Sequence, residues 1–127
     1  MGGVFVTRAL PREPDVMAPD GSEVRILSAT GRGSMAQFRL PPGAISKAMV
    51  HKTVDELWYF THGSGRIWRK SADQEEVKEV MPGLSISIPV GTSFQFRCDG
   101  DEALCAIGVT MPPWPGEDEA QPVAGLW

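Results

Sequence analysis

Two segments, GAISKAMVHKTVDELWYFTHG at residues 43–63 and GLSISIPVGTSF at residues 83–94, decide how this chain folds. Both alternate short apolar runs with glycine or proline, a pattern typical of strands joined by tight turns. Residues two apart in a strand point to the same face, so Met49 and His51 are expected on one side of a sheet. A Pro-Val-Gly turn in the second segment predicts a sharp bend that directs Phe94 inward.

The rest of the chain predicts a single all-β domain. Its 127 residues are too few for two well-packed cores, and 14 glycines and 11 prolines separate its apolar runs. No helical stripe is convincing, and the charged stretch 71–80 is expected to be a solvated hairpin loop that leads into a strand. Strands are predicted near 24–27, 35–40, 45–51, 56–61, 65–69, 79–81, 84–88, 93–98 and 103–110. Many short strands without a helix favour a sandwich or barrel closed on itself.

Composition shifts divide the chain into a barrel and two arms. Residues 1–23 predict an N-terminal arm, residues 24–110 the barrel, and residues 111–127 a C-terminal arm rich in proline and tryptophan. The C-terminal arm is expected to lie over its own or a partner's barrel, with Trp114 and Trp127 as anchors. An exposed PxxP ligand is the alternative interpretation. Exposed arms and sheet edges also favour a homodimer.

Charge and cysteine content narrow the classes of partner. The formal charge is 12 − 16 = −4, which disfavours nucleic acid or an anionic membrane surface as the main partner. No apolar run approaches ~20 residues, and prolines interrupt the first residues before a signal-peptide core can form. We therefore expect a cytoplasmic protein. Cys98 and Cys105 flank a turn and could be cross-strand neighbours, but a reducing cytoplasm would keep both as thiols.

The spacing of the two segments resembles the two sequence motifs of the cupin family, G-x5-H-x-H-x4-E-x6-G and G-x5-P-x-G-x2-H. The matching positions here are Gly43, Met49, His51, Glu56 and Gly63, followed by Gly83, Pro89, Gly91 and Phe94. The likeness covers about residues 39–97 and suits the compact single-domain members of the family. It implies a cupin barrel (a double-stranded β-helix, or jelly roll) and a homodimer.

The resemblance also implies where a metal would lie, and this chain departs from it. In metal-binding cupins three histidines and one glutamate converge on a divalent ion. Here Met49 and Phe94 stand at two of those positions, so only His51 and Glu56 remain. A catalytic zinc site normally has three protein ligands. No tightly bound cofactor is therefore expected, and a weakly held Fe, Mn, Ni or Zn ion at His51 and Glu56 is the alternative.

The candidate site is a pocket inside the barrel. His51 and Glu56 are the candidate catalytic pair, and they could instead be a structural pair that stabilises itself. With Met49 and Phe94 in place of two ligands, the pocket would suit a flat or hydrophobic molecule. The residues expected to contact a ligand are Met49, Phe94, Gln37 and Trp58, with Arg39 and Gln95 as further polar candidates.

Three functions follow from these residues. The first is a small-molecule enzyme of the isomerase, lyase or cyclase type, in which His51 and Glu56 act as an acid/base pair. The second is a weak divalent-metal enzyme of the oxygenase or isomerase type. The third is a non-catalytic ligand-binding or sensing module whose metal site has decayed. A shared barrel does not choose among them.

Overall fold

The computed structural model describes residues 3–127 of the chain. Nearly all of its regular structure is β, as the turn-rich sequence predicts. The only helix within those residues is one short 3-10 turn, η1, so none is long and apolar enough to cross a membrane. The elements are β1 (Val16–Met17), β2 (Glu23–Thr30), β3 (Gly33–Leu40), β4 (Met49–His51), β5 (Asp55–His62), β6 (Gly65–Lys70), β7 (Glu75–Val80), β8 (Ser85–Ile88), β9 (Ser93–Cys98), β10 (Leu104–Met111), η1 (Glu117–Glu119) and β11 (Ala120–Pro122).

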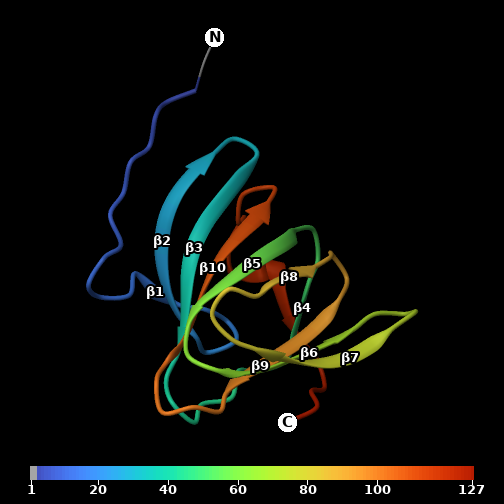
Figure 1. Ribbon diagram of the computed structural model, residues 1–127. Helices are drawn as coiled ribbons and strands as arrows, with labels where there is room; N and C mark the ends of the chain where they lie inside the picture. Colours follow the sequence, from blue (N-terminus) through green and yellow to red (C-terminus); the bar gives the residue numbers. More distant parts are fainter. Residues whose placement is uncertain (1–2) are drawn as a thin grey trace.

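Two antiparallel sheets face each other and form a barrel (Figure 1). One sheet has the strand order β1-β2-β3-β10-β5-β8, and the other has the order β11-β4-β9-β6-β7. The alternating residues of β5, β8 and β9 turn their apolar side chains inward, where they exclude water from the space between the sheets. The innermost side chains include Phe60, Phe94, Phe96, Leu40, Ile67, Ile88 and Leu104.

Each predicted strand region contains a strand, but three details differ from the expectation. The stretch 71–80 is not only a loop, because β7 pairs along its whole length with β6. The side chains of β7 are exposed except for Val80, so the sequence of this strand does not alternate between apolar and polar residues. The predicted strand 45–51 is shorter, since only 49–51 forms β4 and Ile45 makes an isolated bridge to Arg97. Both arms contribute strands, β1 and β11, that the sequence pattern does not predict.

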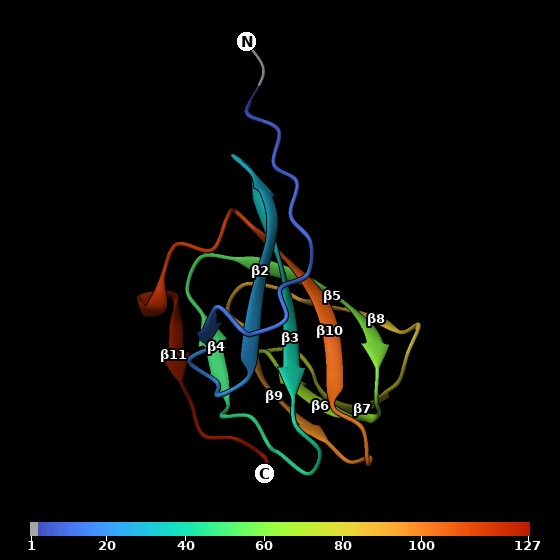
Figure 2. The ribbon, with the colours of Figure 1, turned by 90° about the vertical axis from the view of Figure 1, so that its left-hand side faces the viewer.

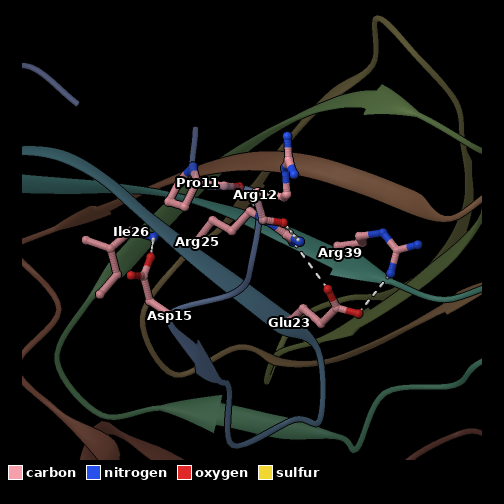
Figure 3. Close-up of polar contacts among 7 residues, drawn as sticks. All are labelled: Pro11, Arg12, Asp15, Glu23, Arg25, Ile26 and Arg39. Carbon is pink, nitrogen blue, oxygen red and sulfur yellow. Dashed lines mark hydrogen bonds and ion pairs between the residues drawn. The ribbon is translucent and has the colours of Figure 1, made fainter. Parts of the chain in front are cut away.

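The N-terminal segment runs along β2 and is fastened to it from residue 11 onward (Figure 2). The Arg25 guanidinium donates hydrogen bonds to the carbonyl oxygens of Pro11 and Arg12 at 3.0 and 2.9 Å. The Asp15 carboxylate accepts a hydrogen bond from the Ile26 amide at 2.8 Å, as Figure 3 shows. These contacts fix the path of the chain into β1 and the turn that follows it.

The C-terminal arm lies on the barrel, and both predicted tryptophan anchors are in place. Strand β11 pairs with β4, and the Gln95 carboxamide binds the last residues by accepting hydrogen bonds from the amides of Leu126 and Trp127. The Trp127 ring lies 5.6 and 5.5 Å from the guanidinium carbons of Arg66 and Arg97, within range of cation–π contact. Gln95 therefore holds the arm and does not line the barrel cavity.

Candidate functional site

A cavity of about 380 Å³ lies inside the barrel between the two sheets. Its walls are mostly apolar, and its polar groups come from four strands and from both arms. The aromatic and large apolar lining residues include Phe38, Met49, Trp58, Phe94 and Trp114. The polar lining residues are Asp20, Ser34, His51, Glu56, Thr110 and Glu117. This volume falls in the ~300–1,000 Å³ range of small-molecule pockets.

His51 and Glu56 meet in this cavity, as their spacing predicts. His51 ends β4 in one sheet and Glu56 lies in β5 of the other, so a short turn brings the two sheets together at the pair. His51 Nδ1 lies 3.2 Å from Glu56 Oε2, and both side chains are buried. Neither atom has a hydrogen-bond partner of good geometry among the described residues. The pair is thus within ion-pair distance but is not locked into a hydrogen bond.

Two aromatic rings hold the imidazole edge-on. The ring centroids of Phe94 and Trp114 each lie 5.1 Å from that of His51, at interplanar angles of 75° and 72°. Trp114 is held in turn from the neighbouring sheet, because its amide donates a hydrogen bond to Ser34 Oγ at 3.0 Å. The Ser34 hydroxyl also bonds the Thr110 hydroxyl at 2.5 Å. Packing on both sides limits rotation of the imidazole ring.

The turn between His51 and Glu56 is held by a carboxylate from the C-terminal arm. Glu119 accepts hydrogen bonds from the Thr53 amide at 2.6 Å, the Thr53 hydroxyl at 2.5 Å and the Val54 amide at 3.0 Å. Burial alone would raise the pKa of Glu119, but these hydrogen bonds outweigh it and hold that pKa below its ordinary value. Glu119 therefore positions the catalytic candidates without lining the cavity.

Asp20 adds a second carboxylate to the cavity, and it comes from the segment predicted to be an outer arm. A tight turn at Gly21, whose φ is +94°, places it there, and its Oδ1 accepts hydrogen bonds from the amide and hydroxyl of Ser22. Burial raises the pKa of Asp20, and the nearby charge of Glu56 raises it further, whereas His51 lowers it. Asp20 therefore adds a carboxyl group to the same cavity as His51 and Glu56.

Not every predicted ligand contact faces the cavity. Met49, Trp58 and Phe94 line it, but Gln37 does not. The prediction for Gln37 was wrong because β3 alternates, and its inward positions are Ala36 and Phe38. Gln37 instead lies opposite Arg25 and Ile107 on the other face of its sheet. Arg39 shares that face and forms an ion pair with Glu23 at 2.8 Å (Figure 3).

The two cysteines are not the cross-strand neighbours that the sequence allowed. Cys98 ends β9 in one sheet and Cys105 is the second residue of β10 in the other, and both are free thiols. Cys98 Sγ lies 3.0 Å from the Glu102 carbonyl oxygen, which it can donate to. Burial raises the pKa of the Cys105 thiol, so this thiol is a poor nucleophile.

The donors in the cavity do not fit a metal ion of the usual cupin kind. Within residues 3–127 no group of three or more histidine, cysteine, aspartate or glutamate side chains is arranged to hold one. The thioether of Met49 and the ring of Phe94 lie where two further ligands would be needed, and Phe94 has no donor atom. The remaining imidazole and carboxylate contact each other. We derive no chemical step through a metal.

Sequence reasoning missed four of the six polar lining residues. For Ser34 and Thr110 a signal exists, because each lies in phase with inward-facing residues, Ala36 and Gly108, on its own strand. For Asp20 and Glu117 no such signal exists, since Asp20 lies in a turn and Glu117 begins the short 3-10 turn η1, outside any strand alternation.

Comparison with known proteins agrees with this architecture. Residues 36–110, more than half of the chain, match the sequence model of the cupin domain. Among the curated proteins, none has a sequence that matches this chain.

Solved structures share the fold at low sequence identity. Peruvianin-I, a cysteine peptidase from Thevetia peruviana latex, is 20% identical with a TM-score of 0.74, over 89% of this chain and 73% of that one. A Bacillus halodurans protein is 19% identical with a TM-score of 0.66, over 81% and 76%. Bacillus subtilis oxalate decarboxylase is 19% identical with a TM-score of 0.67, over 80% of this chain but 28% of that one. Together with the matched model, the fold shows that this chain belongs to the cupin family.

Proposed function

We propose that this cupin binds a small, largely apolar molecule inside its barrel and that His51 and Glu56 transfer a proton on it. One observation carries the proposal: His51 Nδ1 lies 3.2 Å from Glu56 Oε2 at the wall of an apolar cavity of about 380 Å³. A buried, imperfectly paired imidazole and carboxylate are costly to a fold that gains nothing from them. Ligand binding and proton transfer would explain why the protein retains this buried pair.

The pair suits proton transfer at a carbon next to a carbonyl group. With Nδ1 directed at Glu56, Nε2 of His51 is the nitrogen available to a ligand. His51 removes the proton, and the Glu56 carboxylate stabilises the imidazolium that results. Return of that proton to another carbon isomerises the ligand, and the pair ends in its starting state. The imperfect hydrogen bond is expected to tighten when a ligand fills the cavity.

Two alternatives use the same cavity. A non-catalytic binding or sensing module would bind ligands equally well and leave their protons in place. A weak metal enzyme would need further donors, which the two remaining side chains do not supply. The similar Bacillus subtilis oxalate decarboxylase has Mn(II) centres, so elemental analysis of the purified protein is a necessary control. One equivalent of Fe, Mn, Ni or Zn that is lost in His51→Ala would overturn the metal-free proposal.

The test measures exchange of carbon-bound protons for deuterium. Purified protein in D₂O is incubated with 1-indanone and with ethyl acetoacetate, and NMR follows the loss of the α-proton signals. General base catalysis typically contributes ~10²- to 10⁴-fold, so His51→Asn should lower the protein-dependent exchange rate by at least a hundredfold. Glu56→Gln should lower it less, because it keeps the shape but not the charge.

The chain offers a matched control for His51. His62 is the other histidine, it is exposed at the end of β5, and it does not line the cavity. His62→Asn should leave the exchange rate unchanged. Equal rates in wild type and His51→Asn, with binding intact, would favour the non-catalytic module.

A further inference from the structure

The indole nitrogen of Trp58 is a buried donor without a partner. Trp58 is 3% exposed, and its Nε1 has no hydrogen-bond partner among residues 3–127. Trp68 is buried to a similar degree, yet its Nε1 donates to Glu75 Oε2 at 2.8 Å. An unsatisfied buried donor costs ~1–3 kcal/mol, so folded proteins seldom keep one without a use.

The ring edge that carries this donor lies next to a second cavity-lining residue. Trp58 lines the cavity, and so does Gly108 on the adjacent strand β10. A methyl group at position 108 would lie 3.2 Å from Trp58 Cδ1, the atom bonded to Nε1. The pyrrole edge of the ring therefore lies beside the Gly108 backbone, at the wall of the cavity. Glycine there also prevents a clash with Phe38, since the same methyl would lie 2.4 Å from its ring.

Trp58 and His51 face the same ligand space, because one ring contacts both. The Phe94 centroid lies 5.9 Å from that of Trp58 and 5.1 Å from that of His51. Phe38, which also lines the cavity, packs against the indole with a ring-centroid distance of 5.0 Å. A ligand between these rings would be flat, and one edge of it would meet the indole N–H.

The charge of the cavity restricts what can accept that hydrogen bond. Three carboxylate side chains line it, from Asp20, Glu56 and Glu117, and among residues 3–127 no lysine or arginine does. An anionic acceptor such as a carboxylate or phosphate would be repelled in this low-dielectric space. The acceptor must therefore be a neutral oxygen.

We propose that the cavity takes an uncharged, planar carbonyl compound whose oxygen accepts a hydrogen bond from Trp58 Nε1. This inference rests on the proposed function and names its class of substrate. It also gives Trp58 a role in the chemistry: when His51 removes a proton next to the carbonyl, negative charge develops on that oxygen, and the indole N–H stabilises it. The proton moves only from the ligand to His51 and back, and the electron pair of the broken C–H bond stays on the ligand.

The experiment compares two ligands of the same shape in wild type and in Trp58→Phe. 1-Indanone has a carbonyl group, and indane is the same bicycle without the oxygen. Dissociation constants are measured by NMR titration, which also follows the indole N–H resonance that Trp58→Phe identifies. Because water solvates the ketone better than the hydrocarbon, the ratio of the two constants is the quantity to compare between proteins. That ratio should shift about tenfold against 1-indanone in Trp58→Phe, as expected for one hydrogen bond.

Controls separate this inference from the proposed function. Trp68→Phe, whose indole does not line the cavity, should leave the ratio unchanged, and 1-indanecarboxylate should bind most weakly. A ratio that moves less than twofold in Trp58→Phe would mean that solvent satisfies the indole, which overturns the inference. Failure of both neutral compounds to bind would overturn the proposed function as well. A tenfold shift without α-proton exchange would support the carbonyl site and remove only the proton transfer.

Discussion

Replacing Glu119 by alanine should destabilise the fold by about 3 kcal/mol. The carboxylate accepts three hydrogen bonds, two from Thr53 and one from the Val54 amide. Val54 is 0% exposed, so its amide cannot reach water, and an orphaned buried donor costs ~1–3 kcal/mol. Thr53 is exposed and can bind water instead, so its two bonds should cost only ~0.5–1 kcal/mol each.

Urea unfolding followed by tryptophan fluorescence measures this free energy through the midpoint at constant m-value. Glu119→Gln should cost less than Glu119→Ala, because its amide oxygen still accepts one of the two backbone bonds. Asp118→Asn is the matched control: its side chain is exposed and should change the free energy of unfolding by less than ~0.5 kcal/mol.

The pH dependence gives the same prediction a second test. The hydrogen bonds hold the pKa of Glu119 in the folded state below its ordinary value of 4.5. A depressed pKa stabilises the folded state above the unfolded pKa, and this stability is lost as the pH falls through the folded pKa. The difference between wild type and Glu119→Gln should therefore shrink as the pH falls below about 4.5. A difference that is constant from pH 7 to pH 3, or an alanine variant as stable as wild type, would refute the reasoning.

Three further perturbations test other parts of the molecule. Burial raises the pKa of Asp20, so its ionisation weakens the fold as the pH rises above 3.8; in urea titrations Asp20→Asn should gain stability relative to wild type between pH 3 and pH 7, and a constant difference over that range would contradict this. Gly108→Ala drives a methyl group against Phe38 and should lower the free energy of unfolding by ~1–3 kcal/mol; an unchanged urea midpoint would contradict the close packing. The homodimer stays a prediction, and its suggested contact is the extended N-terminal arm (Figure 1), on which Phe5 is 97% exposed. Light scattering should find a dimer that becomes a monomer when residues 3–10 are deleted. A dimer that survives the deletion would place the interface elsewhere.

Much of the barrel is predictable because its strands and turns depend on patterns of a few consecutive residues. Alternation and glycine turns act over a few residues, so the strands from β2 to β10 lie near their predicted positions. Strand β7 shows no alternation of apolar and polar residues, because five of its six side chains are exposed. It is extended because it pairs with β6. Strands β1 and β11 are two and three residues long, below any periodicity that a sequence can display.

In the candidate site, too, residues are predictable where local spacing decides their position and not where distant contacts decide it. The pair His51 and Glu56 follows from spacing, because the two-residue period of a strand and one short turn decide where they point. Gln37 was assigned to the wrong face since alternation fixes which residues share a side, not which side is inward. Asp20 could not be predicted, because it lies in a turn that is tied to the barrel by a distant contact, the hydrogen bond from the Lys47 amide to its carbonyl oxygen.

The cavity draws its lining from both ends of the chain, and this has a consequence for biosynthesis. The lining residues from Val16 to Asp20 leave the ribosome early, whereas Trp114 and Glu117 follow about a hundred residues later. Glu119, whose carboxylate accepts the Val54 amide hydrogen bond, follows Glu117. Strand β10 ends at Met111, only three residues before Trp114, so the last barrel strand and the last lining residues leave the exit tunnel almost together. The ligand chamber is therefore complete only when residues as far as Glu117 have emerged, so a shorter nascent chain cannot enclose a small molecule.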